Sequence, residues 1–147
     1  MKINRITIAG LGLIGGSLAK AFRRTNPDFF IAAVDTNKDD LDAAVAEGII
    51  DHSSTAFDHV TVKSQVVFLC TPLKTLPALL ESLAGLVAEG TIITDTASVK
   101  APIMRAAKDL LPEGVHFIGG HPMSGTEQSG YAASISHLFE NAYYIMT

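Results

Sequence analysis

Three groups of residues in this sequence have types and spacings that could support chemistry. Glycines at positions 10, 12 and 15 follow the pattern G-x-G-x-x-G, in which backbone amides approach the phosphates of a dinucleotide. Ser98 and His121 stand in two later loops and carry a hydroxyl and an imidazole. A histidine titrates near neutral pH, so it could take a proton from a substrate hydroxyl as hydride leaves the same carbon.

The glycine pattern lies between a predicted strand and a predicted helix. A β-branched, apolar run precedes the glycines, and apolar residues at helical spacing follow them. Gly10 allows a tight turn, Gly12 lets the backbone approach a pyrophosphate, and Gly15 lets the helix lie close to the strand. The amides of Leu13 and Ile14 at the helix start are then expected to face the phosphates, with the positive end of the helix dipole behind them.

An acidic residue supports this interpretation of the glycine turn. Asp35 ends the apolar run at 29–34, roughly 20 residues after the glycines, where a Rossmann fold places a carboxylate on the ribose hydroxyls of an adenosine. The same carboxylate would repel a 2′-phosphate, so NAD is the expected cofactor, although Thr36 and Asn37 leave some NADP use open. The alternative is a turn in which the glycines serve packing alone.

Composition indicates one packed domain and excludes several classes of function. The chain has 147 residues, 48% of them hydrophobic, which suits an α/β protein with its own core. A net charge of −4 without a lysine or arginine cluster argues against nucleic acid as a partner. The sequence contains no membrane-length apolar run and no signal-peptide pattern, so we expect a cytoplasmic protein. One cysteine and five scattered histidines predict neither a disulfide nor a metal site.

Strands and helices are predicted to alternate along the chain, which is typical of a Rossmann-like, doubly wound α/β fold with a mostly parallel sheet and helices on both faces. The predicted strands are residues 3–9, 29–34, 49–50, 65–69, 91–95, 116–118 and 141–146. The first two predicted helices begin at Leu13 and after an N-cap at Asn37. The third runs from about 74 to near 87, and the fourth begins at about 102. The last begins after a cap at Ser124 or Thr126 and ends at Tyr131. Residues 51–58 are expected to form a surface connection, and the leucines of the third helix, Leu86 included, to face the sheet.

Ligands of such sheets lie at the carboxyl ends of the strands, and three loops are predicted to meet there. They are residues 70–72, 95–100 and 119–125. Thr71 and Pro72 of the first loop are predicted to contact the cofactor. Ser98 could orient His121, but it could also cap the following helix, and a loop histidine can be purely structural. Lys100 receives no role, and Cys70 is interpreted as a small buried apolar residue.

Three motifs lie in these regions, and the last of them is far more specific than the glycine pattern. They read G-L-G-L-I-G-G-S-L at 10–18, D-T-A-S-V-K at 95–100 and G-G-H-P-M-S-G-T-E-Q-S-G at 119–130. Together they resemble the nucleotide-binding half of prephenate dehydrogenases, a family that includes arogenate and cyclohexadienyl dehydrogenases, over essentially the whole chain. The resemblance implies oxidative decarboxylation of prephenate to 4-hydroxyphenylpyruvate in tyrosine biosynthesis, with NAD taking the hydride.

The resemblance also implies roles for individual residues. His121 would be catalytic and Ser98 would assist it, while Ser124, Gly125 and Thr126 would lie on the substrate side. Members of the family continue into a helical domain that supplies the dimer contact and an arginine for the substrate carboxylates. We therefore expect residues 1–147 to be the NAD-binding domain of a longer, homodimeric enzyme, with little or no turnover of their own.

Three other interpretations stay open at the level of sequence. The substrate could be arogenate, because discrimination between it and prephenate would lie largely in the second domain. A 3-hydroxy acid, as in related dehydrogenases, is disfavoured because the Gly-Gly-His-Pro loop has no evident task there. A non-catalytic NAD-binding or redox-sensing module, complete at 147 residues, belongs to a different class of function.

Overall fold

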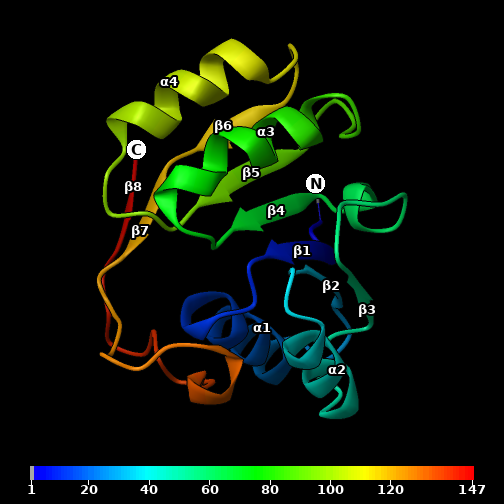
Figure 1. The fold of residues 1–147 in the computed structure, drawn as a ribbon, viewed down its shortest axis with the longest axis vertical. Helices are drawn as coiled ribbons and strands as arrows, with labels where there is room; N and C mark the ends of the chain where they lie inside the picture. The colour runs from blue at the N-terminus through cyan, green and yellow to red at the C-terminus, as the bar shows by residue number, and fades with distance from the viewer. Residues whose placement is uncertain (1) are drawn as a thin grey trace.

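The computed structural model describes residues 2–147, in which helices cover both faces of a central sheet (Figure 1). The strands are β1 (Arg5–Ala9), β2 (Phe30–Val34), β3 (His52–Ser54), β4 (Val66–Leu69), β5 (Ile92–Asp95), β6 (His116–Ile118), β7 (Gly120–Pro122) and β8 (Tyr144–Met146). The helices are α1 (Leu13–Thr25), α2 (Lys38–Ala46), α3 (Leu76–Ala84) and α4 (Ala101–Leu110). Short 3-10 turns span Thr61–Lys63, Leu73–Thr75 and Tyr131–Ala133.

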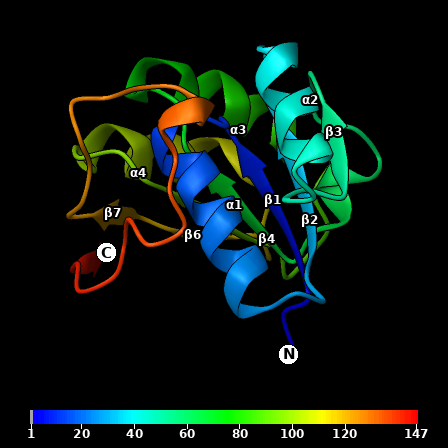
Figure 2. The same cartoon turned by 90° about the horizontal axis from the view of Figure 1, so that it is seen from below.

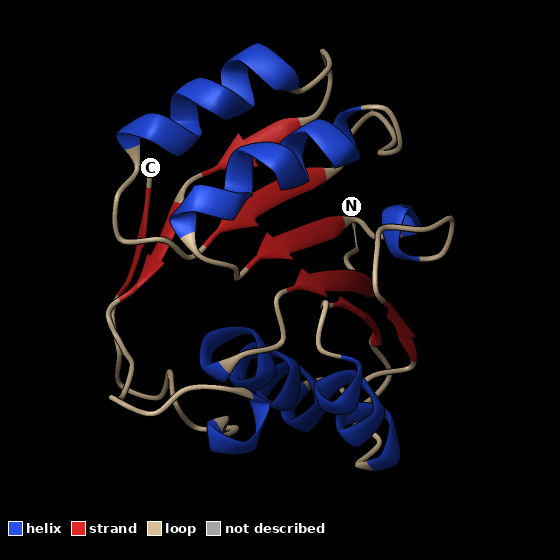
Figure 3. Cartoon of the chain, in the orientation of Figure 1, coloured by secondary structure: helices blue, strands red, loops and turns tan. Residues whose placement is uncertain are grey.

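The large sheet has the strand order β3-β2-β1-β4-β5-β6, and each of its pairs is parallel. α1 and α2 cover one face, and α3 and α4 cover the other (Figures 1 and 3). The strand order reverses between β1 and β4, which creates a crevice at the carboxyl ends of these strands. The predicted Rossmann-like α/β fold is therefore confirmed.

Apolar side chains from the central strands form a separate core on each face of the sheet. Ile6, Ile8 and Ile31 pack in the core under α1 and α2. Val67 and Ile93 pack in the core under α3 and α4. These strands read as continuous apolar runs because both of their faces are covered by helices.

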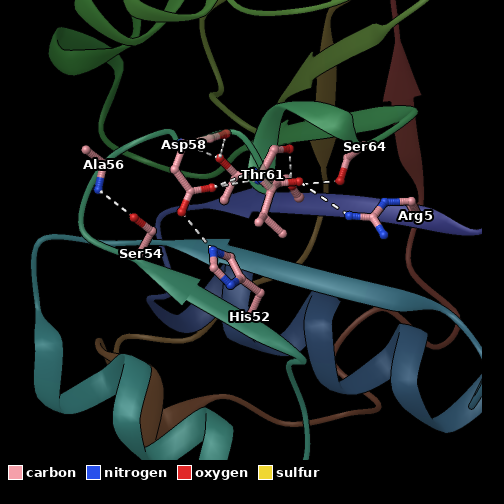
Figure 4. A network of polar contacts seen from close by, with 9 residues as sticks. Arg5, His52, Ser54, Ala56, Asp58, Thr61 and Ser64 are labelled. Atoms are coloured by element: carbon pink, nitrogen blue, oxygen red, sulfur yellow. Dashed lines mark hydrogen bonds and ion pairs between the residues drawn. The ribbon is translucent and has the colours of Figure 1, made fainter.

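The connection from β3 to β4 contains a 3-10 turn that polar contacts hold against β1 (Figure 4). The Asp58 carboxylate accepts hydrogen bonds from the amides of Val60 and Thr61, and it lies 2.8 Å from Nε2 of His52. The buried Thr7 hydroxyl of β1 donates to the Thr61 carbonyl. Burial would raise the pKa of Asp58, but the amide of Thr61, the ring of His52 and the amide of Val60 hold this pKa well below its usual range.

The last segment of the chain crosses to the α1 side of the sheet and returns as β8, antiparallel to β7 (Figures 1 and 2). Tyr131 is buried, and its hydroxyl donates to the Glu47 carboxylate. The hydroxyl of Ser17 on α1 accepts a hydrogen bond of 3.0 Å from the amide of Ile135. A Cβ on Gly16 would lie 2.8 Å from Ser134, so this segment packs directly on the first turns of α1.

Two predicted elements are wrong. The strand expected at 49–50 falls instead at His52–Ser54, inside the predicted surface connection. Ile50 is buried in the core, and its amide donates to the Ala44 carbonyl in the last turn of α2. The helix expected to end at Tyr131 is a 3-10 turn that begins there. β3 is short and polar, so hydrophobic periodicity could not place it.

Smaller corrections concern the predicted loop at 119–125, in which Gly120–Pro122 form the strand β7, the third helix and the last strand. A 3-10 turn precedes α3, which ends at Ala84, and Leu86 is 50% exposed instead of facing the sheet. The last strand is limited to Tyr144–Met146, since Asn141 has a φ of 59°, which is incompatible with an extended strand. The other predicted strands and helices lie within about two residues of their observed bounds.

Candidate functional site

The turn between β1 and α1 has the geometry that its three glycines predict. Gly10 has a φ of +92°, and a Cβ on Gly15 would lie only 1.9 Å from the Gly10 carbonyl oxygen. Gly12 is the N-cap of α1, and a Cβ placed there would meet nothing within 4 Å. The described residues include no side-chain cap and no acidic side chain in the first turn of α1. The amides at this helix start therefore face open space and suit an anion.

Asp35 is fixed at the end of β2 by the backbone. Its Oδ2 accepts a hydrogen bond of 2.6 Å from the amide of Leu11, and its Oδ1 accepts one of 2.8 Å from the amide of Asn37. A carboxylate has about four acceptor positions, so both oxygens retain capacity for ribose hydroxyls. Besides its predicted place on a ribose, Asp35 thus anchors the glycine turn.

A cavity of about 610 Å³ opens at the point where the strand order reverses. The predicted residues Gly10, Gly12, Asp35, Thr71 and Pro72 all line it. Its size lies within the roughly 300–1,000 Å³ typical of small-molecule sites. The remaining lining is largely apolar and consists of Ala9, Val34, Thr36, Thr55, Ala56, Phe57, Cys70, Thr75, Ala78, Leu79, Ser82 and Leu86.

Part of this lining was missed by reasoning from the sequence. α3 contributes Ala78, Leu79 and Ser82, and the segment after β3 contributes residues 55–57. The leucine at 86 departs from its expected packing because it borders this cavity instead of the sheet. The only signal in the sequence for this different packing was the position of Leu86 at the end of the leucine series, which lies beyond α3.

Cys70 lies at the cavity in an environment that disfavours its thiolate form. Its residue is partly exposed, whereas desolvation raises the pKa of its thiol to about 12. A thiol with this pKa stays protonated at neutral pH and is a poor nucleophile. Cys70 packs with the apolar core as interpreted, but it is partly exposed instead of buried.

The two predicted reactive residues lie at the same edge of the sheet, beyond the cavity. His121 is on β7, opposite Ile145 of β8, and its Nδ1 is buried with no hydrogen-bond partner among residues 2–147. Ser98 is exposed in the loop after β5, and it does not cap α4, whose N-cap is Lys100. No hydrogen bond joins Ser98 to His121 within the described chain. A buried ring nitrogen without a partner is uncommon in folded proteins, so this nitrogen retains its capacity for a hydrogen bond.

The predicted substrate-side residues belong to the long loop after β7. The Ser124 hydroxyl donates a hydrogen bond of 2.6 Å to the Leu138 carbonyl, so it holds the loop in place. Gly125 and Thr126 are exposed, and the Thr126 hydroxyl accepts from the amide of Gln128. None of these residues lines the 610 Å³ cavity.

Residues 18–147 match the family model described as the nucleotide-binding domain of prephenate dehydrogenase. The chain belongs to the prephenate dehydrogenase family. It is 40% identical over 144 residues to the prephenate dehydrogenase of Bacillus subtilis, which covers 97% of this chain and 38% of that protein. The family resemblance of the three motifs is therefore confirmed.

Two solved structures of this family have the same fold. A prephenate dehydrogenase from A. aeolicus in complex with hydroxyphenyl propionate and NAD+ is 32% identical with a TM-score of 0.89, and the match covers 100% of this chain and 51% of that one. Synechocystis arogenate dehydrogenase is 35% identical with a TM-score of 0.88, covering 97% of this chain and 49% of that one. The chain thus spans about half the length of each of these two proteins and 38% of the length of the Bacillus protein. In residues 2–147, no helix is long and apolar enough to cross a membrane.

Proposed function

We propose that this chain is the NAD-binding domain of an enzyme that oxidatively decarboxylates prephenate to 4-hydroxyphenylpyruvate. The observation that carries the proposal is the placement of His121, with an unpaired Nδ1, at the same sheet edge as a cavity that contains Gly12 and Asp35. A cofactor site and a proton acceptor are the two parts that hydride transfer from a hydroxyl-bearing carbon requires. Membership of the prephenate dehydrogenase family supports the choice of reaction.

The residues of the cavity fit NAD. The fixed Asp35 carboxylate suits the adenosine ribose and disfavours a 2′-phosphate, while the open side of Gly12 and the amides of Leu13 and Ile14 suit the pyrophosphate. Gly15 serves the site indirectly by letting α1 approach β1. Bound NAD supplies the acceptor for the hydride that leaves the substrate ring. Thr71 and Pro72 border the cavity after β4.

His121 handles the proton in the proposed reaction. It takes the proton of the hydroxyl on ring carbon C4 as hydride leaves that carbon. The carbon–carbon bond to the ring carboxylate then breaks, its electron pair makes the ring aromatic, and the oxygen on C4 regains a proton. Carbon dioxide is the leaving group, so atoms and charge balance without a further reactant.

Ser98 and the loop after β7 assist His121 in this proposal. The buried Nδ1 of His121 needs a partner, and the Ser98 hydroxyl lies in the loop that follows the neighbouring strand β5. A hydrogen bond from Ser98 would fix the ring and its tautomer. Ser124, Gly125 and Thr126 are proposed to lie toward the substrate.

The longer protein is proposed to add a helical domain that forms a homodimer and supplies an arginine for the substrate carboxylates. The chain spans 38% of its Bacillus relative, which leaves room for such a domain. The 147-residue chain alone is then expected to bind NAD and to turn over little substrate.

The direct test follows NADH and carbon dioxide formation by the full gene product with prephenate and with arogenate. Prephenate and NAD should give both products in equal amounts. A strong preference for arogenate would make arogenate the substrate instead of prephenate. Arogenate is the second candidate because the chain is 35% identical to Synechocystis arogenate dehydrogenase. Oxidation of neither compound would overturn the enzyme assignment and favour the non-catalytic NAD-binding module.

A further inference from the structure

Asp95 is a fully buried carboxylate at the end of β5, and it contacts the strand that carries His121. Its Oδ1 accepts a hydrogen bond of 3.1 Å from the amide of Gly120, the residue before His121. A Cβ on Gly120 would lie 2.5 Å from the Asp95 carbonyl oxygen and 2.6 Å from the Tyr144 hydroxyl. β7 therefore packs directly on the end of β5, with little freedom to shift.

The other oxygen of the same carboxylate holds the loop of Ser98. Oδ2 of Asp95 accepts a hydrogen bond of 3.1 Å from the amide of Ala97 and forms an ion pair with the Nζ of Lys100. These two residues stand on either side of Ser98. Lys100, to which the sequence assigned no role, thus provides the charge that a buried carboxylate requires.

We propose that Asp95 is a positioning residue that sets the Ser98 loop and the His121 strand relative to each other. This inference rests on the proposed function of Ser98 and His121. Each oxygen of the carboxylate accepts hydrogen bonds from one of the two loops. Because a desolvated carboxylate needs all of its donors, a movement of either loop would also weaken the contacts that hold the other loop. The side chain has no solvent exposure, so it acts on the reaction only through the two loops.

The first test is Asp95→Asn in the full gene product. Asparagine has nearly the same shape but only one acceptor oxygen, so it can hold only one of the two loops. A misplacement of about 1 Å costs roughly a hundredfold in rate, so we expect a fall in kcat of that order. Asp95 does not line the cofactor cavity, so the Kd for NAD should stay within about twofold.

Asp58→Asn is the matched control. Asp58 also accepts two backbone amides and contacts a nitrogen-bearing side chain, His52, but it lies in the connection between β3 and β4. Both variants should lower the free energy of unfolding, whereas Asp95→Asn alone should lower kcat. Equal kcat values for the two variants would overturn the proposal.

A double-mutant cycle separates positioning from a general loss of structure. If Asp95 places the Ser98 hydroxyl, Ser98→Ala should reduce kcat strongly in the unmutated enzyme and much less in the Asp95→Asn background. Additive effects of the two substitutions would contradict the inference. If Asp95→Asn does not fold, Lys100→Met takes its place, with recovery of kcat in Lys100→Arg as the expected result and no recovery as the contradicting one.

A readout independent of turnover distinguishes this inference from the proposed function. The Cε1–H signal of His121 can be assigned in an NMR spectrum by its loss in His121→Asn. Asp95→Asn should shift this signal, and Asp58→Asn should not. An unshifted signal would overturn the positioning role, whereas failure of the unmutated protein to oxidise either substrate would overturn only the proposed function.

Discussion

Two regions at the same edge of the sheet are built in different ways. The proposed cofactor region is assembled within the chain, where the glycine turn, Asp35 and the walls of a 610 Å³ cavity come together. The reactive region is not, since Ser98 is exposed and the Nδ1 of His121 has no partner among the described residues. The groups proposed to bind the cofactor are held by contacts within this domain, whereas the groups proposed to react still lack contacts.

The difference has a physical origin. The cofactor region relies on backbone groups, which the glycines expose and the strand–helix turn orients, so a short stretch of sequence determines it. The reactive region relies on side chains from separate strands, and the Asp95 carboxylate links them across 25 positions of sequence between Asp95 and Gly120. Substitutions in one region should therefore leave the other intact.

The largest expected effect is that of His121→Asn on turnover. Asparagine cannot take a proton at neutral pH, and loss of a general base costs about 10²–10⁴-fold in rate. Steady-state NADH formation by the full gene product should therefore show kcat lower by that factor, with NAD binding largely kept. His116→Asn, at an exposed histidine of β6, is the control and should leave kcat unchanged. An unchanged kcat in His121→Asn would remove His121 from the reaction.

Gly15→Ala should damage the cofactor region most. The added Cβ would lie 1.9 Å from the Gly10 carbonyl oxygen, so α1 must move away from the glycine turn. We expect a loss of roughly 1–3 kcal/mol in unfolding free energy and at least tenfold weaker NAD binding. Gly85→Ala adds the same methyl group where nothing lies within 4 Å, and it should change neither quantity. Unaltered NAD affinity in Gly15→Ala would contradict the role of this close approach.

Asp35→Ser should change the choice of cofactor. The shorter, neutral side chain no longer repels a 2′-phosphate, and it cannot reach both amides that Asp35 now binds. Discrimination against NADP should fall about tenfold, with some loss of NAD affinity. Asp39→Ser makes the same change of charge on the exposed side of α2 and should preserve discrimination. Equal use of NAD and NADP by the unmutated protein would contradict the role of Asp35.

The smallest effect is expected far from either region, at Asp58. Its pKa is held below the ordinary value, so its contribution to stability is present above about pH 4 and is lost as the pH falls through the lowered pKa. Urea unfolding should show Asp58→Asn about 1–2 kcal/mol less stable than the unmutated protein at pH 7, and the gap should narrow below pH 3. A gap that widens on acidification would contradict the lowered pKa.

Local patterns in the sequence predicted the parts of the molecule that local forces determine. The glycine turn, Asp35 and the cap at Asn37 follow from residue types at short spacing, and Asn37 Oδ1 does accept from the amides of Asp39 and Asp40. Tertiary placement determined the rest. β3 is polar because it lies at the edge of the sheet, and Tyr131 begins a 3-10 turn that packs on α1 instead of ending an α-helix.

The candidate site divides in the same way. Gly10, Gly12 and Asp35 could be predicted from sequence to lie together at one cavity because their motif includes its own spacing rule. The central place of Asp95 could not be predicted, because its partner Gly120 lies 25 positions away in the sequence and becomes its neighbour only when β7 packs on the end of β5. Residue type gave no signal either, since a carboxylate is seldom fully buried.

A titration of NAD into the 147-residue chain tests the central claim most directly. If the cofactor region is complete in this chain, calorimetry should show saturable binding at a single site. His121→Asn should bind with the same Kd, and Asp35→Ser should bind more weakly. Absence of saturable binding, or a Kd that changes with His121 and not with Asp35, would contradict the account.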